Sequence, residues 1–186
     1  MIILMCLRGY EQGLEKMIEM KVMGIALDVR TNSPIVVLHD LDNRKALPIW
    51  IGSAEASAII RCIEGLVVAR PMTHDLIANL IEKTGYKLDK IEINNVEKET
   101  YYATLYLSKD GCEALEIDAR PSDAIAIAMR CDAPIFVTAN VLMNGSVSTD
   151  TEKDAEEAQE FKDFIQNIKP SDFEKLMKGK HEENDQ

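Results

Sequence analysis

The residues best suited to chemistry lie in two short segments that begin fifty residues apart and share a pattern, ARPMTHD from position 69 and ARPSD from position 119. Proline forces the preceding residue into extended backbone, and the hydroxyl residue that follows is a good helix cap. We therefore expect Arg70 and Arg120 to stand beside helix N-termini capped by Thr73 and Ser122. An arginine beside free helix amides is a site for an anion such as phosphate.

An aspartate follows each arginine, and two interpretations of it are open. Asp75 and Asp123 fall in first helical turns, where a carboxylate complements the helix dipole and can pair with an arginine to fix the helix on the sheet. Alternatively, the acids hold a divalent metal, Mg²⁺ or Mn²⁺, beside the phosphate-binding arginines, as metal-assisted phosphodiester cleavage requires. The candidate ligands are Asp75, Asp118, Asp123 and Glu55.

His74 is the best acid/base candidate among the three histidines, because it lies next to Asp75 in the first turn of the expected helix. The helix dipole disfavours a protonated imidazole there, which leaves a neutral ring able to accept a proton. A structural histidine bonded to backbone or to a carboxylate is an equally open interpretation.

The elements that must position these residues come in blocks. Three β-rich runs, 22–31, 33–40 and 46–52, predict one antiparallel meander, and 86–96, 100–108 and 112–119 predict a second, with turn signals between the runs. A short apolar run at 133–137 predicts one further strand. Such segregation indicates an α+β domain.

Three helices are expected, at 54–68, from Thr73 to a stop at Gly85, and at 123–130. The first two should bury stripes that comprise Ile59, Ile63, Leu66 and Val67 in one and Leu76, Ile77, Leu80 and Ile81 in the other. The third helix is apolar nearly all round and should be buried.

The ends of the chain differ from its middle. Residues 1–16 show neither a helical stripe nor strand alternation and are predicted to be a poorly anchored or non-native leader before a domain at 17–144. Residues 145–186 are predicted to form a charged, acidic helical tail whose apolar positions have helical spacing. Those positions are Phe161, Phe164, Ile165 and Ile168.

Composition limits the class of protein. The net charge is −11, so no overall field draws the chain to nucleic acid or to an anionic membrane, and any nucleic-acid contact must be local and weak. The four cysteines lack metal-ligand spacing and are taken as reduced thiols. Nucleotide-binding, zinc-protease and serine-hydrolase motifs are missing. The opening apolar stretch is too short to span a membrane, and a cytoplasmic protein is expected.

Three blocks, LPIWIGSAEASAI, RPMTHDLIANLI and IDARPSDAIAIAMR, resemble the bifunctional nuclease family in order and spacing. The resemblance covers roughly residues 17–144. It implies an α+β domain that associates with itself and a nuclease (RNase and DNase) activity. The family's motif positions are all present here: Glu55, Arg70, Thr73, His74, Asp75, Asp118, Arg120, Ser122 and Asp123.

The leading hypothesis is a metal-assisted nuclease with His74 as acid/base, Asp75 and Asp123 as catalytic carboxylates, and Arg70 and Arg120 as phosphate ligands. The alternative is a non-catalytic oligomeric binding or regulatory module, in which the arginines and acids form a structural network or receive a small phosphorylated ligand. A homodimer or larger assembly is expected from the apolar runs LPIWIG and APIFV.

Overall fold

The computed structural model describes residues 16–66, 68–98 and 100–148. Its elements follow one another in the order strand, strand, strand, helix, helix, strand, strand, strand, helix, strand, helix, strand. Their bounds are β1 Met17–Leu27, β2 Pro34–Asp40, β3 Lys45–Trp50, α1 Ser53–Ile63, α2 Thr73–Lys83, β4 Lys87–Glu97, β5 Thr100–Ser108, β6 Leu115–Ala119, α3 Pro121–Arg130, β7 Ile135–Thr138, α4 Ala139–Gly145 and β8 Val147–Ser148.

The α+β prediction is confirmed, and both meanders form, but they are parts of one sheet. In the described chain the strand order is β6-β5-β4-β7-β1-β2-β3-β8. The short strand β7 joins the two halves, because it pairs antiparallel with β1 and parallel with β4. Only four residue pairs connect β1 to β7, and β1 continues beyond them beside β2 alone. The sheet therefore forks next to β7.

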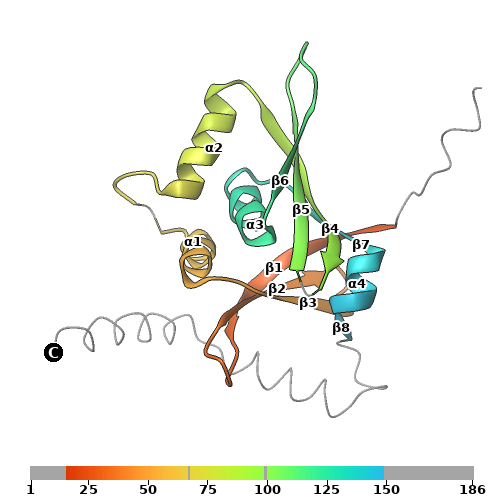
Figure 1. The fold of residues 1–186 in the computed structure, drawn as a ribbon. Helices are drawn as coiled ribbons and strands as arrows, with labels where there is room; N and C mark the ends of the chain where they lie inside the picture. Colours follow the sequence, from red (N-terminus) through yellow and green to blue (C-terminus); the bar gives the residue numbers. More distant parts are fainter. Residues whose placement is uncertain (1–15, 67, 99, 149–186) are drawn as a thin grey trace, which may run out of the picture.

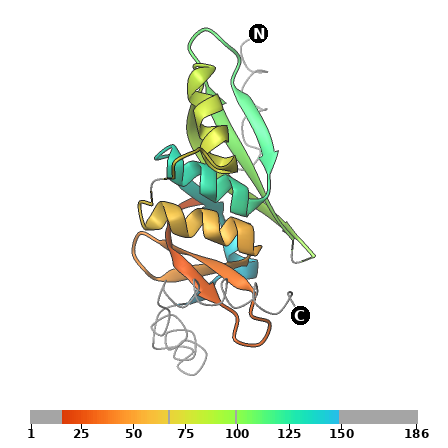
Figure 2. The same cartoon turned by 90° about the vertical axis from the view of Figure 1, so that its left-hand side faces the viewer.

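Helices α1, α3 and α2 lie side by side, in that order (Figure 2). Helix α1 packs on β1 and β2, whereas α3 packs on β4 and β5. Helix α3 is the most deeply buried of the three, as expected, with every residue from Ala124 to Ala128 buried. Its burial places the first turn of α3 at the centre of the helical layer, where α1 and α2 can both reach it.

Helix α2 protrudes from the layer (Figure 1). Of its four residues that were predicted to be buried, two are exposed. Leu76 and Leu80 are 51% and 54% exposed, while Ile77 and Ile81 pack against the core. The buried residue of α2 is His74. Helix α1 likewise ends at Ile63, before its predicted end, because Gly65 takes the left-handed conformation that stops a helix.

The expected count of three helices is too low, because a fourth helix, α4, follows β7 directly. It is short and ends at Gly145, where the predicted acidic tail begins. Thr138 caps it by accepting a hydrogen bond from the Val141 amide. No helix in the described part of the chain is both long and apolar enough to cross a membrane. The leader apart from Lys16, and the predicted tail beyond Ser148, lie outside the described residues. The start of the predicted helical tail is different from expectation, because Gly145 ends α4 and Val147–Ser148 form the strand β8.

Candidate functional site

The three helices of the layer share one feature at their N-termini: an acid at the third helical position. These acids are Glu55 in α1, Asp75 in α2 and Asp123 in α3. A carboxylate in the first turn stabilises the helix by complementing its dipole, so the sequence favours an acid there for local reasons alone. The tertiary structure gives the three acids different partners.

Asp123 is the centre of the first group. Its Oδ1 lies 2.9 Å from His74 Nε2, and its Oδ2 accepts a hydrogen bond of 2.6 Å from Arg120 Nε. Burial raises the pKa of the Asp123 carboxyl, but the hydrogen bonds from Arg120 and His74 outweigh burial and hold the pKa below its usual value. An ionised carboxylate can only accept hydrogen bonds. Nε2 of His74 therefore carries a hydrogen and donates a hydrogen bond to Asp123.

Arg120 links Asp123 to helix α1. Its Nη2 donates to Glu55 Oε1 at 2.9 Å, and the hydrogen bonds to Asp123 and then to Glu55 raise the pKa of the guanidinium. Glu55 folds back over Gly52, the residue before α1, where any Cβ would collide with its carboxylate. The Arg120 side chain remains 66% exposed. A guanidinium has five N–H donors, so those not used by Asp123 and Glu55 can contact an anion.

Asp75 belongs to a second, more enclosed group built around Arg130, the last residue of α3. Arg130 Nε donates to Asp75 Oδ1 at 2.5 Å, and the Met72 amide donates to Asp75 Oδ2 at 2.8 Å. The other guanidinium nitrogens donate to the carbonyl oxygens of Ala126 in α3 and Ala58 in α1. Arg130 is 11% exposed and ties three helices together. The Arg130 hydrogen bond, followed by that of Met72, lowers the pKa of Asp75.

Arg130 is the residue that sequence reasoning missed. The signal was present, because a lone arginine ends an otherwise apolar helix, and a buried arginine needs an acid or carbonyl partner. The sequence pattern predicts Arg130 only as the last residue of a helix. Asp75 and Arg130 also line a cavity of about 200 Å³ between the helix ends.

The remaining predicted site residues stand apart from both groups. Arg70 is exposed and takes part in none of the ion pairs found among the described residues. Asp118 is exposed on β6. Thr73 and Ser122 do not cap their helices, because α2 begins after Met72 and α3 begins after Arg120, with Pro121 at its first position. Proline suits that position, since its missing N–H would have no helical partner there.

The predicted metal site does not fit this arrangement. Oxygens of Asp75 and Asp123 are held by arginine, amide or imidazole donors, and Glu55 is paired with Arg120. Among residues 16–66, 68–98 and 100–148, no three histidine, cysteine, aspartate or glutamate side chains gather in a set that could hold a metal ion. Binding of Mg²⁺ or Mn²⁺ stays a prediction.

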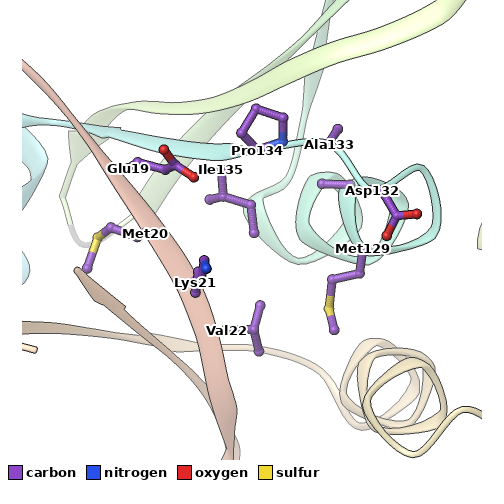
Figure 3. Close-up of a pocket in the computed structure, with 10 residues that line it drawn as sticks. Glu19, Met20, Lys21, Val22, Met129, Asp132, Ala133, Pro134 and Ile135 are labelled. Carbon is purple, nitrogen blue, oxygen red and sulfur yellow. The ribbon is translucent and has the colours of Figure 1, made fainter. Parts of the chain in front are cut away.

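A larger cavity of about 390 Å³ lies in the fork of the sheet, between β1 and the turn from α3 to β7 (Figure 3). Glu19 and Lys21 line it from β1, and Asp132 lines it from the turn. None of the predicted site residues lines it. The two arginine groups are thus the arrangement that the sequence motifs build, and the fork is a separate feature.

Comparison with known proteins places this chain in a family. The model of the bifunctional nuclease domain matches residues 36–150. An uncharacterized protein of Mycobacterium tuberculosis (strain ATCC 25618 / H37Rv) is 36% identical over 163 residues, which cover 83% of this chain and 97% of that protein.

Two plant proteins that carry the nuclease name match a smaller region. Bifunctional nuclease 2 of Oryza sativa subsp. japonica is 36% identical over 107 residues, covering 56% of this chain and 33% of that protein. Bifunctional nuclease 1 of Arabidopsis thaliana is 32% identical over 127 residues, covering 62% of this chain and 39% of that protein. The match to the domain model includes both arginine groups, and this chain belongs to the bifunctional nuclease domain family.

Proposed function

We propose that this protein is a nuclease that hydrolyses phosphodiester bonds in RNA or DNA, with His74 as acid/base and Arg120 as the phosphate ligand. The observation that carries the proposal is the 2.9 Å contact between His74 Nε2 and Asp123 Oδ1, which joins the first turns of α2 and α3. A histidine oriented by an ionised carboxylate, beside an arginine with free donors, is the set of groups that phosphoryl chemistry uses.

The roles follow from the hydrogen bonds. Since Nε2 donates to Asp123, the neutral ring carries its lone pair on Nδ1, and Nδ1 takes the proton from the attacking water or ribose hydroxyl. Asp123 stabilises the imidazolium that results, and Nδ1 returns the proton to the leaving oxygen. The exposed N–H groups of Arg120 bind the non-bridging phosphate oxygens and stabilise the charge that develops on them.

Asp75 has a supporting role in this proposal. Its oxygens accept hydrogen bonds from Arg130 and the Met72 amide, and neither oxygen is hydrogen-bonded to His74. It fixes the start of α2, and therefore the position of His74 relative to Asp123. Substitution of Asp75 should act through the position of His74, as a change in the helix start rather than in proton transfer.

The alternative function is a non-catalytic module in which both groups are structural. The observation that favours it is the pairing of all three helix-start acids with arginines, because such pairs by themselves fix how helices meet. In that case Arg120, with its exposed donors, would bind a small phosphorylated ligand without cleaving it.

His74→Gln separates the two functions. Glutamine Nε2 can keep the hydrogen bond to Asp123, but an amide cannot take up a proton at neutral pH, so cleavage should fall by about 10² to 10⁴-fold while stability changes little. The assay uses fluorescently labelled single-stranded RNA and DNA, with Mg²⁺, with Mn²⁺ and with a chelator. His39→Gln, a change on β2 outside both groups, is the matched control and should cleave like the wild type.

The outcome decides between the functions. Wild-type cleavage that His74→Gln abolishes and His39→Gln retains supports the nuclease. Wild-type protein without activity on either substrate would favour the non-catalytic module. Cleavage by His74→Gln at the rate of His39→Gln would instead contradict the role of His74 as acid/base.

A further inference from the structure

The edge strand β6 carries side chains that the proposed nuclease site does not use. Among the described strands, β6 stands at one end of the sheet and pairs with β5 alone. Its residues from Leu115 to Asp118 are all exposed. Along its outer side the N–H and C=O of every second residue therefore lack a strand partner within the described part of the chain, and such an edge is a template for another strand.

One face of β6 is apolar. Ile117 lies opposite Leu105 and Leu115 lies opposite Leu107 in the β5 pairing, so these four side chains share a face of the sheet. Leu105 and Leu107 are buried under the helical layer, whereas Leu115 and Ile117 are 40% and 46% exposed. The apolar face thus continues past the helices to the open edge.

The other face of β6 is acidic. Glu116 lies opposite Tyr106 and Asp118 lies opposite Thr104. Neither acid takes part in an ion pair found among the described residues. By contrast, Glu92 on β4 is neutralised by Lys90 at 2.5 Å. Within residues 16–66, 68–98 and 100–148, the two acids of β6 therefore remain as negative charges without an ion-pair partner at the edge.

The acids argue against a second copy of this chain as the occupant of the edge. In an antiparallel pair of β6 strands centred on Ile117, Glu116 of one copy lies opposite Asp118 of the other, and like charges placed opposite each other destabilise a sheet. Every register that keeps Leu115 and Ile117 on the apolar face also keeps the acids together on the other face. A basic strand removes this repulsion.

We propose that β6 is a docking edge for an extended segment of another protein, which adds a strand to the sheet. Its lysine or arginine side chains, at alternate positions, pair with Glu116 and Asp118, and its intervening apolar side chains cover Leu115 and Ile117. Main-chain hydrogen bonds supply affinity, and the alternation of charge and apolar groups supplies specificity. Asp118, predicted from the sequence to bind metal, has its function at this edge.

The test uses two synthetic nonapeptides, one alternating lysine with valine and one alternating glutamate with valine, both blocked at their ends. The full-length wild type should bind the lysine peptide at least about tenfold more tightly by fluorescence anisotropy. Amide hydrogen exchange should slow at 115–119. In E116K/D118K the preference should invert. It should not invert in the matched control E64K/E82K, which changes two exposed acids, one at the C-cap of α1 and one in α2.

Three results would overturn the proposal. Equal affinity of the wild type for the two peptides, including no binding of either, would show that the edge does not recognise basic strands. An unchanged preference in E116K/D118K, with its fold verified by circular dichroism, would place binding elsewhere. Concentration-dependent dimerisation of the wild type with slowed exchange at 115–119 would make a second copy the occupant.

Discussion

The two Ala-Arg-Pro segments share a sequence pattern but have different roles, and the difference lies in where each helix begins. In the second segment Arg120 is the N-cap and Asp123 is three residues later, within reach of its guanidinium. In the first segment two more residues separate arginine from aspartate, so Arg70 lies outside the helix and Asp75 pairs with Arg130. A motif defined by residue types therefore says less about a site than the distance from each residue to the helix start.

Removal of Arg130 should have the largest effect, because it would leave Asp75 and two backbone carbonyls without their donor. We expect Arg130→Met to lower the free energy of unfolding by about 3 kcal/mol, measured by urea denaturation. Arg120→Met is the comparison within the motif and should cost about 1 kcal/mol or less, because that side chain is two-thirds exposed. Equal losses in the two variants would contradict the assignment of Arg130 as the structural arginine.

Substitution of Asp123 should chiefly affect catalysis, whereas substitution of Asp75 should chiefly affect stability. Asp123→Asn removes the carboxylate that orients His74, and we expect kcat for cleavage of RNA or DNA to fall at least about a hundredfold. Asp75→Asn keeps an oxygen for the Met72 amide and should lower kcat by less than about tenfold while lowering the urea midpoint. The reverse order of effects on kcat would make Asp75, rather than Asp123, the carboxylate on which cleavage depends.

Lowering the pH should gradually remove the stabilisation that Asp75 and Asp123 provide, with a smaller effect than the substitutions above. The pKa of Asp75 is lowered chiefly by Arg130, and that of Asp123 also lies below the ordinary 3.8 because Arg120 and His74 outweigh burial. As pH falls, the unfolded chain takes up these protons first, so the stabilisation is complete above the unfolded-state pKa and is lost as pH falls through the folded-state pKa.

The measurement is urea unfolding of wild type and of D75N/D123N between about pH 7 and pH 2. The stability difference should be constant above about pH 5 and shrink below about pH 4. A difference that grows on acidification would mean that the pKa values of these carboxyls are raised in the folded protein.

Arg70→Met should have the smallest effect on stability. Because Arg70 is exposed and lacks an ion pair among the described residues, the free energy of unfolding should change by less than about 0.5 kcal/mol. A loss as large as that of Arg120→Met, in the same urea experiment, would show that the two motif arginines are equivalent after all.

The sequence by itself determined the local structure well. Runs of β-favouring residues bounded by turn signals located β2, β4 and β5, and the stop at Gly85 is confirmed by its positive φ of 79°. The acids at the third helical positions were also readable, since the helix dipole acts within a single turn. These features depend on neighbours a few residues away, which a sequence shows directly.

Partners across the fold were decided only by the tertiary structure. Asp75 and Arg130 are 55 residues apart, and Glu55 and Arg120 are 65 apart, so their pairing follows from how α1, α2 and α3 pack rather than from any local pattern. The same packing leaves Leu76 exposed and buries His74, against the apolar stripe of α2. Side-chain type fixes what a residue can bond to, and the packing of helices on the sheet fixes which of those partners it meets.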